Sequence, residues 1–147
     1  MALNLYMLGL LVKDMGQSLE FYRRLGLAVP QEWDGRTHVE VKMGNGLTFF
    51  LDSKPTRWDP QFQGFSEQQS TTATTVPGGY RSVLEFYLKT REAVSAKYAE
   101  LIACGYQSRR APYASPIGMY FAMVADPDDN TILLSGDLEA HDASKVS

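Results

Sequence analysis

LYMLGLLVKDMGQSLEFYRRLG, residues 5–26, is the stretch that decides the fold. Residues 5–12 carry no charge, which predicts a strand that is buried on both faces. Asp14 then provides an N-cap, and Gln17 follows three residues later, as in a capping box. Apolar side chains recur at helical spacing after the cap, and Gly26 suits the left-handed position that ends a helix. The stretch therefore predicts a strand followed by a helix that covers one face of a sheet.

The residues after this stretch predict three further strands before residue 53. Residues 27–33 supply the first of them, ahead of a turn at Asp34-Gly35. Residues 37–43 alternate apolar and polar side chains, which indicates a half-buried strand. Gly44-Asn45-Gly46 is typical of a hairpin turn, and residues 47–51 return as the last strand. The first half of the chain is therefore predicted to be strand–helix–strand–strand–strand.

The second half repeats this order of elements. Residues 80–88 predict a strand, Thr90 can cap a helix, and Gly105 ends that helix. Three strands follow at residues 106–110, 119–124 and 131–135, with a loop over 112–118 and a turn at 126–130. The chain is therefore predicted to be an internal duplication of a unit of about 60 residues.

The length of 147 residues predicts a single domain made of these two modules. We expect module 1 at about residues 4–53, a linker at about 54–79, module 2 at about 80–136 and a polar tail at 137–147. The linker contains Trp58, Phe62 and Phe65, which are too apolar for a simple spacer, so its first part could cover a pocket or a neighbouring subunit.

Composition excludes several classes of protein. The formal net charge is −3, so no basic surface is available to neutralise phosphates, and we expect no nucleic-acid partner. The single cysteine, Cys104, excludes an intramolecular disulfide and a cysteine-based zinc cluster. No apolar run approaches about 20 residues, so we expect no membrane partner. No secretory signal is visible, and a cytoplasmic location is the expectation.

Two motifs resemble those of the vicinal oxygen chelate superfamily, which includes glyoxalase I, extradiol dioxygenases and bleomycin-resistance proteins. They are VKDM at 12–15 with SLEFY at 18–22 and Leu25-Gly26, and DPDDNTI at 126–132. Within that superfamily the chain is most similar to the mitomycin-binding resistance proteins, at DMGQSLEFYRRLG (14–26), KYAELIACGY (97–106) and Asp59-Pro60. The resemblance implies an α+β fold of two tandem βαβββ modules. Their eight strands would form a curled mixed sheet around a cup, with the helices outside and homodimers that pair modules across subunits.

The resemblance also locates four positions at which metal enzymes of the superfamily carry His, Gln or Glu ligands. They fall at Met7, within residues 47–51, near Val83 and at Leu133. None of these positions has such a ligand, and methylene or aryl groups cannot bind a divalent cation. The sequence therefore predicts no metal, no cofactor and no catalytic residue.

An apolar cup with a few polar groups suits a flat or hydrophobic small molecule. The resemblance to the mitomycin-binding proteins makes Phe62 and Tyr113 the first candidate contacts, because those proteins have aromatic residues there. Phe49 and Phe50 point to opposite faces of a strand, so only one of them, taken as Phe50, can line the cup. The predicted ligand-binding residues are Phe62, Tyr113, Trp58, Phe50, His38, Tyr120, Met7, Leu133 and Glu85. Core packing is the alternative for the aromatic residues, and surface charge is the alternative for His38 and Glu85.

Three hypotheses for function follow. The leading one is a non-catalytic protein that sequesters a planar aromatic or quinone-like compound of antibiotic type. The second is a metal-dependent dioxygenase or lyase with unusual ligands, for which His38, Glu40 and Glu85 are the available donors. The third is a regulatory or partner-binding dimer whose cup is filled by its own side chains.

Overall fold

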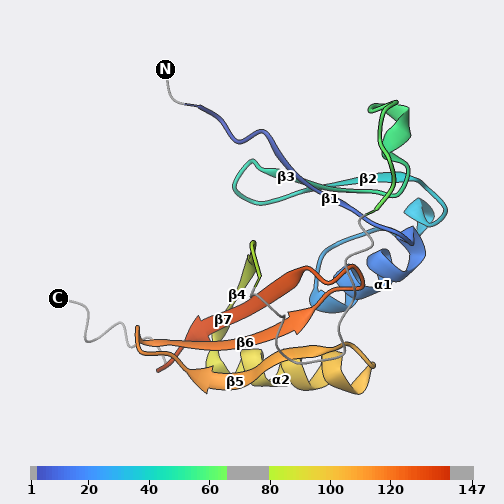
Figure 1. Cartoon of the computed structure of the whole chain (residues 1–147). Coiled ribbons are helices and arrows are strands. Elements are labelled where there is room, and N and C mark those ends of the chain that lie inside the picture. The colour runs from blue at the N-terminus through green and yellow to red at the C-terminus, as the bar shows by residue number, and fades with distance from the viewer. Residues whose placement is uncertain (1–2, 66–79, 140–147) are drawn as a thin grey trace. The chain divides into compact units, whose positions relative to one another are not determined.

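The computed structural model describes residues 3–65 and 80–139, in which seven strands and two α-helices form (Figure 1). The chain divides into two compact units, Met1–Gln69 and Ser70–Ser147, which are called the first and second unit below. Each unit is a mixed sheet with one α-helix, so the expected α+β fold of βαβββ type is confirmed. No helix among the described residues is long and apolar enough to cross a membrane.

The first unit contains three strands. Its elements are β1 (Met7–Leu11), α1 (Met15–Leu25), β2 (His38–Lys42) and β3 (Thr48–Asp52), with short 3₁₀ turns at Gln31–Trp33 and Pro55–Arg57. The strand order is β1-β3-β2, in which β1 runs parallel and β2 antiparallel to β3.

Helix α1 begins and ends where the sequence predicts. The Asp14 carboxylate accepts a hydrogen bond from the backbone N–H of Gln17 at 3.0 Å, which satisfies one N–H of the first turn. Gly26 has φ 128°, a left-handed conformation that a side chain would strain, and its N–H bonds back to the last turn. One face of the sheet packs against this helix and forms the core. Val39, Val41, Phe49 and Leu51 are all buried, and the ring of Phe49 lies 5.4 Å from that of Tyr22 on α1.

Two predictions for the first unit are wrong. Residues 27–33 form no strand, because Pro30 has no N–H to donate and the Arg23 guanidinium takes the carbonyl groups of Val29 and Pro30, at 2.8 and 2.6 Å. The described residues therefore hold seven strands, not eight. Strand β1 is also not buried on both faces: Leu8 and Gly9 are exposed, since β1 is an edge strand bonded to β3 alone among the described strands.

The second unit has all four expected strands. Its elements are β4 (Leu84–Thr90), α2 (Arg91–Ala103), β5 (Ser108–Ala114), β6 (Met119–Ala125) and β7 (Thr131–Asp137), in the sheet order β4-β7-β6-β5. The predicted cap is confirmed, because Thr90 Oγ1 accepts from the N–H of Ala93 at 3.1 Å. The predicted loop over 112–118 begins later than expected, because β5 continues through Pro112 and Tyr113 with a shift in register that accommodates the proline.

Candidate functional site

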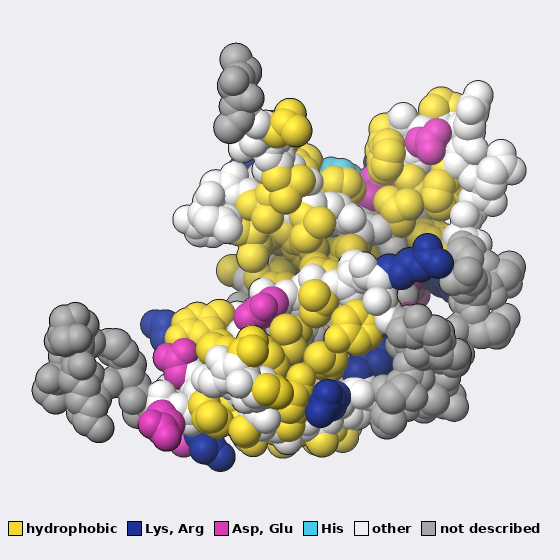
Figure 2. Space-filling view, turned by 60° about the vertical axis from the view of Figure 1, so that its left-hand side comes forward, with side chains coloured by type: hydrophobic (Ala, Val, Ile, Leu, Met, Phe, Trp, Pro, Cys, Tyr) yellow, Lys and Arg dark blue, Asp and Glu magenta, His cyan; other side chains and the backbone are white. Residues whose placement is uncertain are grey.

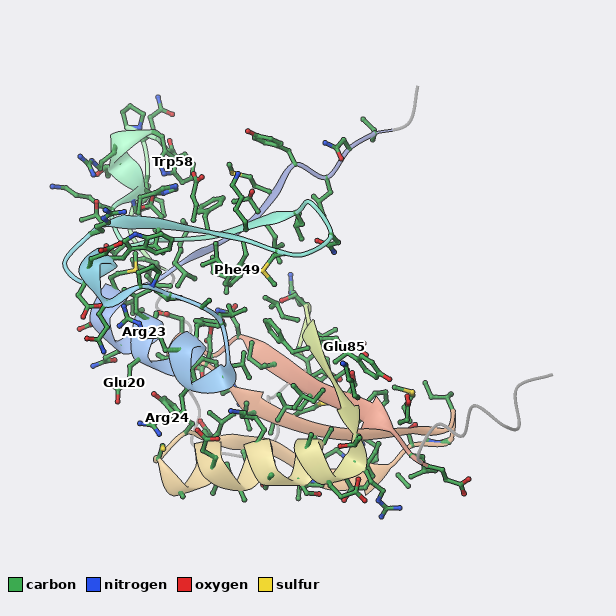
Figure 3. All side chains as sticks on the ribbon, turned by 180° about the vertical axis from the view of Figure 1, so that it is seen from behind. Glu20, Arg23, Arg24, Phe49, Trp58 and Glu85 are labelled. Carbon is green, nitrogen blue, oxygen red and sulfur yellow. The ribbon has the colours of Figure 1, made fainter. Side chains whose placement is uncertain are left out.

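The face of the first sheet that points away from Phe49 and Leu51 carries a cluster of polar and aromatic side chains, and is called the site face. Figure 3 shows Phe49 on the side of this sheet where α1 lies, and Trp58 beyond the opposite side. Residues paired across strands share a face, so the strand register defines its members. They are Met7, Gly9 and Leu11 of β1, His38, Glu40 and Lys42 of β2, and Thr48, Phe50 and Asp52 of β3.

Asp52 is the centre of the cluster. Its side chain is 1% exposed and is the direct cross-strand partner of His38. Its Oδ2 lies 2.8 Å from Nδ1 of His38 and accepts a hydrogen bond from Nε1–H of Trp58 at 2.9 Å. Its Oδ1 accepts from the backbone N–H of Lys54 at 2.7 Å. Three donors thus fix a buried carboxylate at the end of β3.

His38 lies between two carboxylates. Its Nε2 is 2.9 Å from Oε2 of Glu40, while Nδ1 faces Asp52. Carboxylates only accept hydrogen bonds, so the arrangement requires that both ring nitrogens donate, as in the imidazolium ion. Figure 2 shows a histidine side chain (cyan) at the surface, next to acidic and hydrophobic side chains.

The pKa values of the pair move in opposite directions. Desolvation lowers the pKa of His38, but the hydrogen bonds to Glu40 and Asp52, together with the charges of these residues, outweigh it and raise the pKa above its ordinary value. Desolvation raises the pKa of Asp52, but the hydrogen bonds from Trp58, His38 and Lys54 outweigh it and lower the pKa. Both shifts favour the charged pair.

These shifts predict how stability depends on pH. The folded pKa of His38 is raised, so its contribution is complete below the unfolded value of about 6.5 and is lost as the pH rises through the folded pKa. The folded pKa of Asp52 is lowered, so its contribution is present above about 3.9 and is lost as the pH falls through the folded pKa. We expect the unfolding free energy of wild type to exceed that of His38→Gln by a margin that shrinks as the pH rises from about 6.5 through the folded pKa of His38. Urea unfolding of both proteins across that range measures the margin, and a margin that stays constant would contradict the ion pair.

Phe50 provides a flat apolar surface beside this charged pair. Its ring covers Gly9: a Cβ at position 9 would lie 1.9 Å from Cζ of Phe50, so only glycine admits the ring there. The ring centroids of Phe50 and His38 are 5.2 Å apart at an interplanar angle of 31°. The site face thus presents two neighbouring, similarly inclined rings that are held by the sheet.

The other predicted site residues of the first unit lie on or near this face. Met7 is on the site face opposite Thr48, two residues from Gly9. Trp58 is 55% exposed and joins the cluster through Asp52. Phe62 packs its ring edge-on against Phe65 at 5.5 Å.

The second unit holds the remaining predicted residues on two different faces. Glu85 and Leu133 are direct partners on one face, and Tyr113 on β5 contacts Phe121 at 5.9 Å, with the Arg110 guanidinium 3.7 Å from its ring centroid. Tyr120 lies on the other face, where its hydroxyl accepts from Ser95 of α2 at 3.2 Å. The structure therefore does not group Tyr120 with Glu85 and Leu133.

The residues at the predicted metal positions do not fit a metal. Met7 and Leu133 stand at two of these positions, and the β3 residues facing the same way as Met7 are Thr48, Phe50 and Asp52. No group of three or more His, Cys, Asp or Glu side chains in residues 3–65 and 80–139 could hold an ion. In the His38 cluster the two carboxylates bind opposite sides of one imidazole, so the donors do not converge on a common point.

Sequence reasoning missed Asp52 and Arg109. Counting outward from the Gly44-Asn45-Gly46 turn along the two strands pairs position 38 with position 52, so this signal was available for Asp52. Arg109 is 3% exposed and bonds Asp129 through Nη2 at 3.0 Å, while its buried Nε and Nη1 have no hydrogen-bond partner in the part of the chain that the structure describes. Nothing in the local sequence pattern distinguishes Arg109 from the exposed Arg110.

Comparison with known proteins agrees with this architecture. A family model described as the Glyoxalase/Bleomycin resistance protein/Dioxygenase superfamily matches residues 4–134. The solved structure of a glyoxalase/bleomycin resistance protein/dioxygenase family enzyme from Burkholderia phytofirmans is similar, with a TM-score of 0.68, 19% identity and coverage of 92% of this chain and 100% of that chain. A lactoylglutathione lyase from Agrobacterium tumefaciens is similar with a TM-score of 0.59, 17% identity and coverage of 90% and 92%. No curated protein matches the chain. The match to the family model covers most of the sequence, and the chain therefore belongs to the glyoxalase/bleomycin resistance protein/dioxygenase superfamily.

Proposed function

We propose that this protein binds and sequesters a small planar aromatic or quinone-like molecule, of antibiotic type, without converting it. The observation that carries the proposal is the ring of Phe50, which lies flat over Gly9 beside the ring of His38. Offset stacking contributes about 0.5–1.5 kcal/mol per aromatic pair beyond the area buried. The resemblance to the mitomycin-binding resistance proteins, which hold their drug between aromatic planes, supports the same function.

The chemistry of the donors supports binding over turnover. Metal enzymes of the superfamily polarise substrate oxygens with a bound cation. Here Met7 and Leu133 stand at two of the predicted ligand positions. Glu85 is the one strong donor close to the third position, near Val83. The donor chemistry at these positions therefore favours binding over a metal-dependent dioxygenase or lyase.

Tryptophan fluorescence provides the test. Trp58 lies 2.9 Å from Asp52 in the cluster, so replacing Trp33 by phenylalanine leaves an indole that reports on the site face. Titration of Trp33→Phe with planar aromatic antibiotics and quinones should give saturable quenching at one ligand per chain, and chromatography should recover the compound unchanged. Phe50→Leu should weaken this binding by about tenfold, since it removes the stacking surface. Catalytic conversion, or saturable binding that Phe50→Leu leaves unaltered, would contradict the proposal.

The homodimer expected from the resemblance belongs to the same proposal. Leu5, Tyr6 and Leu8 are exposed along and before β1, whose second edge has no strand partner among the described residues. A row of large apolar side chains on an open strand edge favours association with a second chain.

A further inference from the structure

We propose that the ligand of the site face carries an anionic oxygen, of a carboxylate, phenolate or enolate, that replaces Glu40 on Nε2 of His38. This inference rests on the proposed function and names the chemical class that the site selects. Glu40 then acts as an internal stand-in for the anion of the ligand.

The two carboxylates beside His38 differ in how firmly they are held. The side chain of Asp52 is 1% exposed and has two further donors, Trp58 Nε1–H and the N–H of Lys54. The side chain of Glu40 is 39% exposed, and its one hydrogen bond among the described residues is to His38. Asp52 is thus a fixed partner of the imidazole, whereas Glu40 can move into solvent.

Exchange of Glu40 for a ligand anion has a low cost. Exposed ion pairs stabilise weakly, by no more than about fivefold in an equilibrium constant. A departing Glu40 regains full hydration, and the incoming anion restores the charge-assisted hydrogen bond to Nε2–H. A neutral ligand would leave that N–H with a weaker acceptor, and a cationic group cannot accept its hydrogen bond.

The strand register places an aromatic surface next to the exchangeable group. Glu40 and Phe50 are direct cross-strand partners on the site face, and the Phe50 ring lies 5.2 Å from that of His38. An anionic group that takes the place of Glu40 therefore carries its attached ring onto Phe50. Acidic planar compounds satisfy both contacts at once.

Calorimetric titration with 2-naphthoate and its neutral analogue 2-naphthamide tests this inference. Wild type should bind naphthoate about tenfold more tightly than naphthamide. Glu40→Gln removes the competing charge, so it should bind naphthoate about fivefold more tightly than wild type and naphthamide about equally. Glu20→Gln, an equal charge change at an exposed position of α1 (Figure 3), is the matched control and should leave both affinities unchanged.

His38→Gln should abolish the preference for naphthoate. If this variant does not fold, the pH dependence of the wild type replaces it: naphthoate affinity should fall as the pH rises through the pKa of His38, while naphthamide affinity stays constant. Equal affinities for the two probes, unaffected by Glu40→Gln, would overturn the inference and leave the proposed function intact. Failure of both probes to bind at millimolar concentration would overturn both.

Discussion

Asp52→Asn is expected to lower the unfolding free energy of the chain by about 1–3 kcal/mol, because a buried hydrogen-bond network loses its acceptor. The wild-type carboxylate accepts from Nδ1–H of His38, Nε1–H of Trp58 and the N–H of Lys54. An amide has one acceptor oxygen and one NH₂ group. In either orientation of the amide, the NH₂ group faces at least one of these N–H groups, and at 1% exposure no water can intervene.

Urea unfolding monitored by circular dichroism measures this change. Asp34→Asn is the matched control, because Asp34 also pairs with a cation, Arg23 at 2.8 Å, but its side chain is 59% exposed. We expect the control to lower the unfolding free energy by less than about 0.5 kcal/mol. The same experiment on Asp52→Asn should show a lower pKa for His38 by NMR titration, since the fixed negative charge is gone. Equal stabilities of the two variants would contradict the central role of Asp52.

Gly9→Ala is expected to expel the ring of Phe50 from its place on the sheet. A Cβ at position 9 would come within 1.9, 2.2 and 2.4 Å of three ring carbons of Phe50, far inside van der Waals contact. Gly9 is exposed and the clashing atoms are the far end of the Phe50 side chain, so the ring can swing away at a cost of about 0.5–1.5 kcal/mol. The displaced ring also leaves the neighbourhood of His38, so binding of planar ligands should weaken by more than about tenfold.

The double variant Gly9→Ala/Phe50→Ala separates the two effects. Without the ring there is no clash, so the double variant should be about as stable as Phe50→Ala alone. Its ligand binding should stay weak, because the stacking surface is gone. Gly44→Ala serves as control, because a Cβ there would meet no atom within 4 Å and the φ of Gly44 is not positive. A Gly9→Ala variant with wild-type stability and wild-type affinity would show that Phe50 does not occupy this position.

The elements that depend on local sequence signals were predicted well. The ends of helix α1 are set by the Asp14 cap and by Gly26, each of which acts on the adjacent helical turn. The alternation of side chains in β2 correctly places Val39 and Val41 on the face opposite the site face. The strand predicted at residues 27–33 does not form, because backbone carbonyl groups of this stretch accept hydrogen bonds from Arg23. An apolar pattern does not record a contact of this kind. The exposure of β1 was missed for a similar reason, since an apolar run does not show whether a second strand covers its edge.

The site could be predicted in part. His38, Phe50, Met7 and Trp58 were identified from residue type and spacing, and the structure places all four on or beside one face of the first sheet. Asp52 was overlooked because it stands at the boundary of the apparent linker, where its role depends on the cross-strand register. Tyr120 bonds to Ser95 of α2, a placement that the sequence does not indicate, because an aromatic residue in an apolar strand has the same sequence signature whether it faces a helix or a ligand.

Binding on the site face is tested most directly by the position of the His38 ring signal in a histidine NMR titration with 2-naphthoate. The chain has two histidines, so the spectrum is simple, and His141, which lies outside the described residues, is the internal reference. We predict that the Cε1–H resonance of His38 shifts in proportion to occupancy while that of His141 does not move, and that Phe50→Leu suppresses the shift. Saturable binding that leaves the His38 resonance in place would show that the ligand does not occupy the site face.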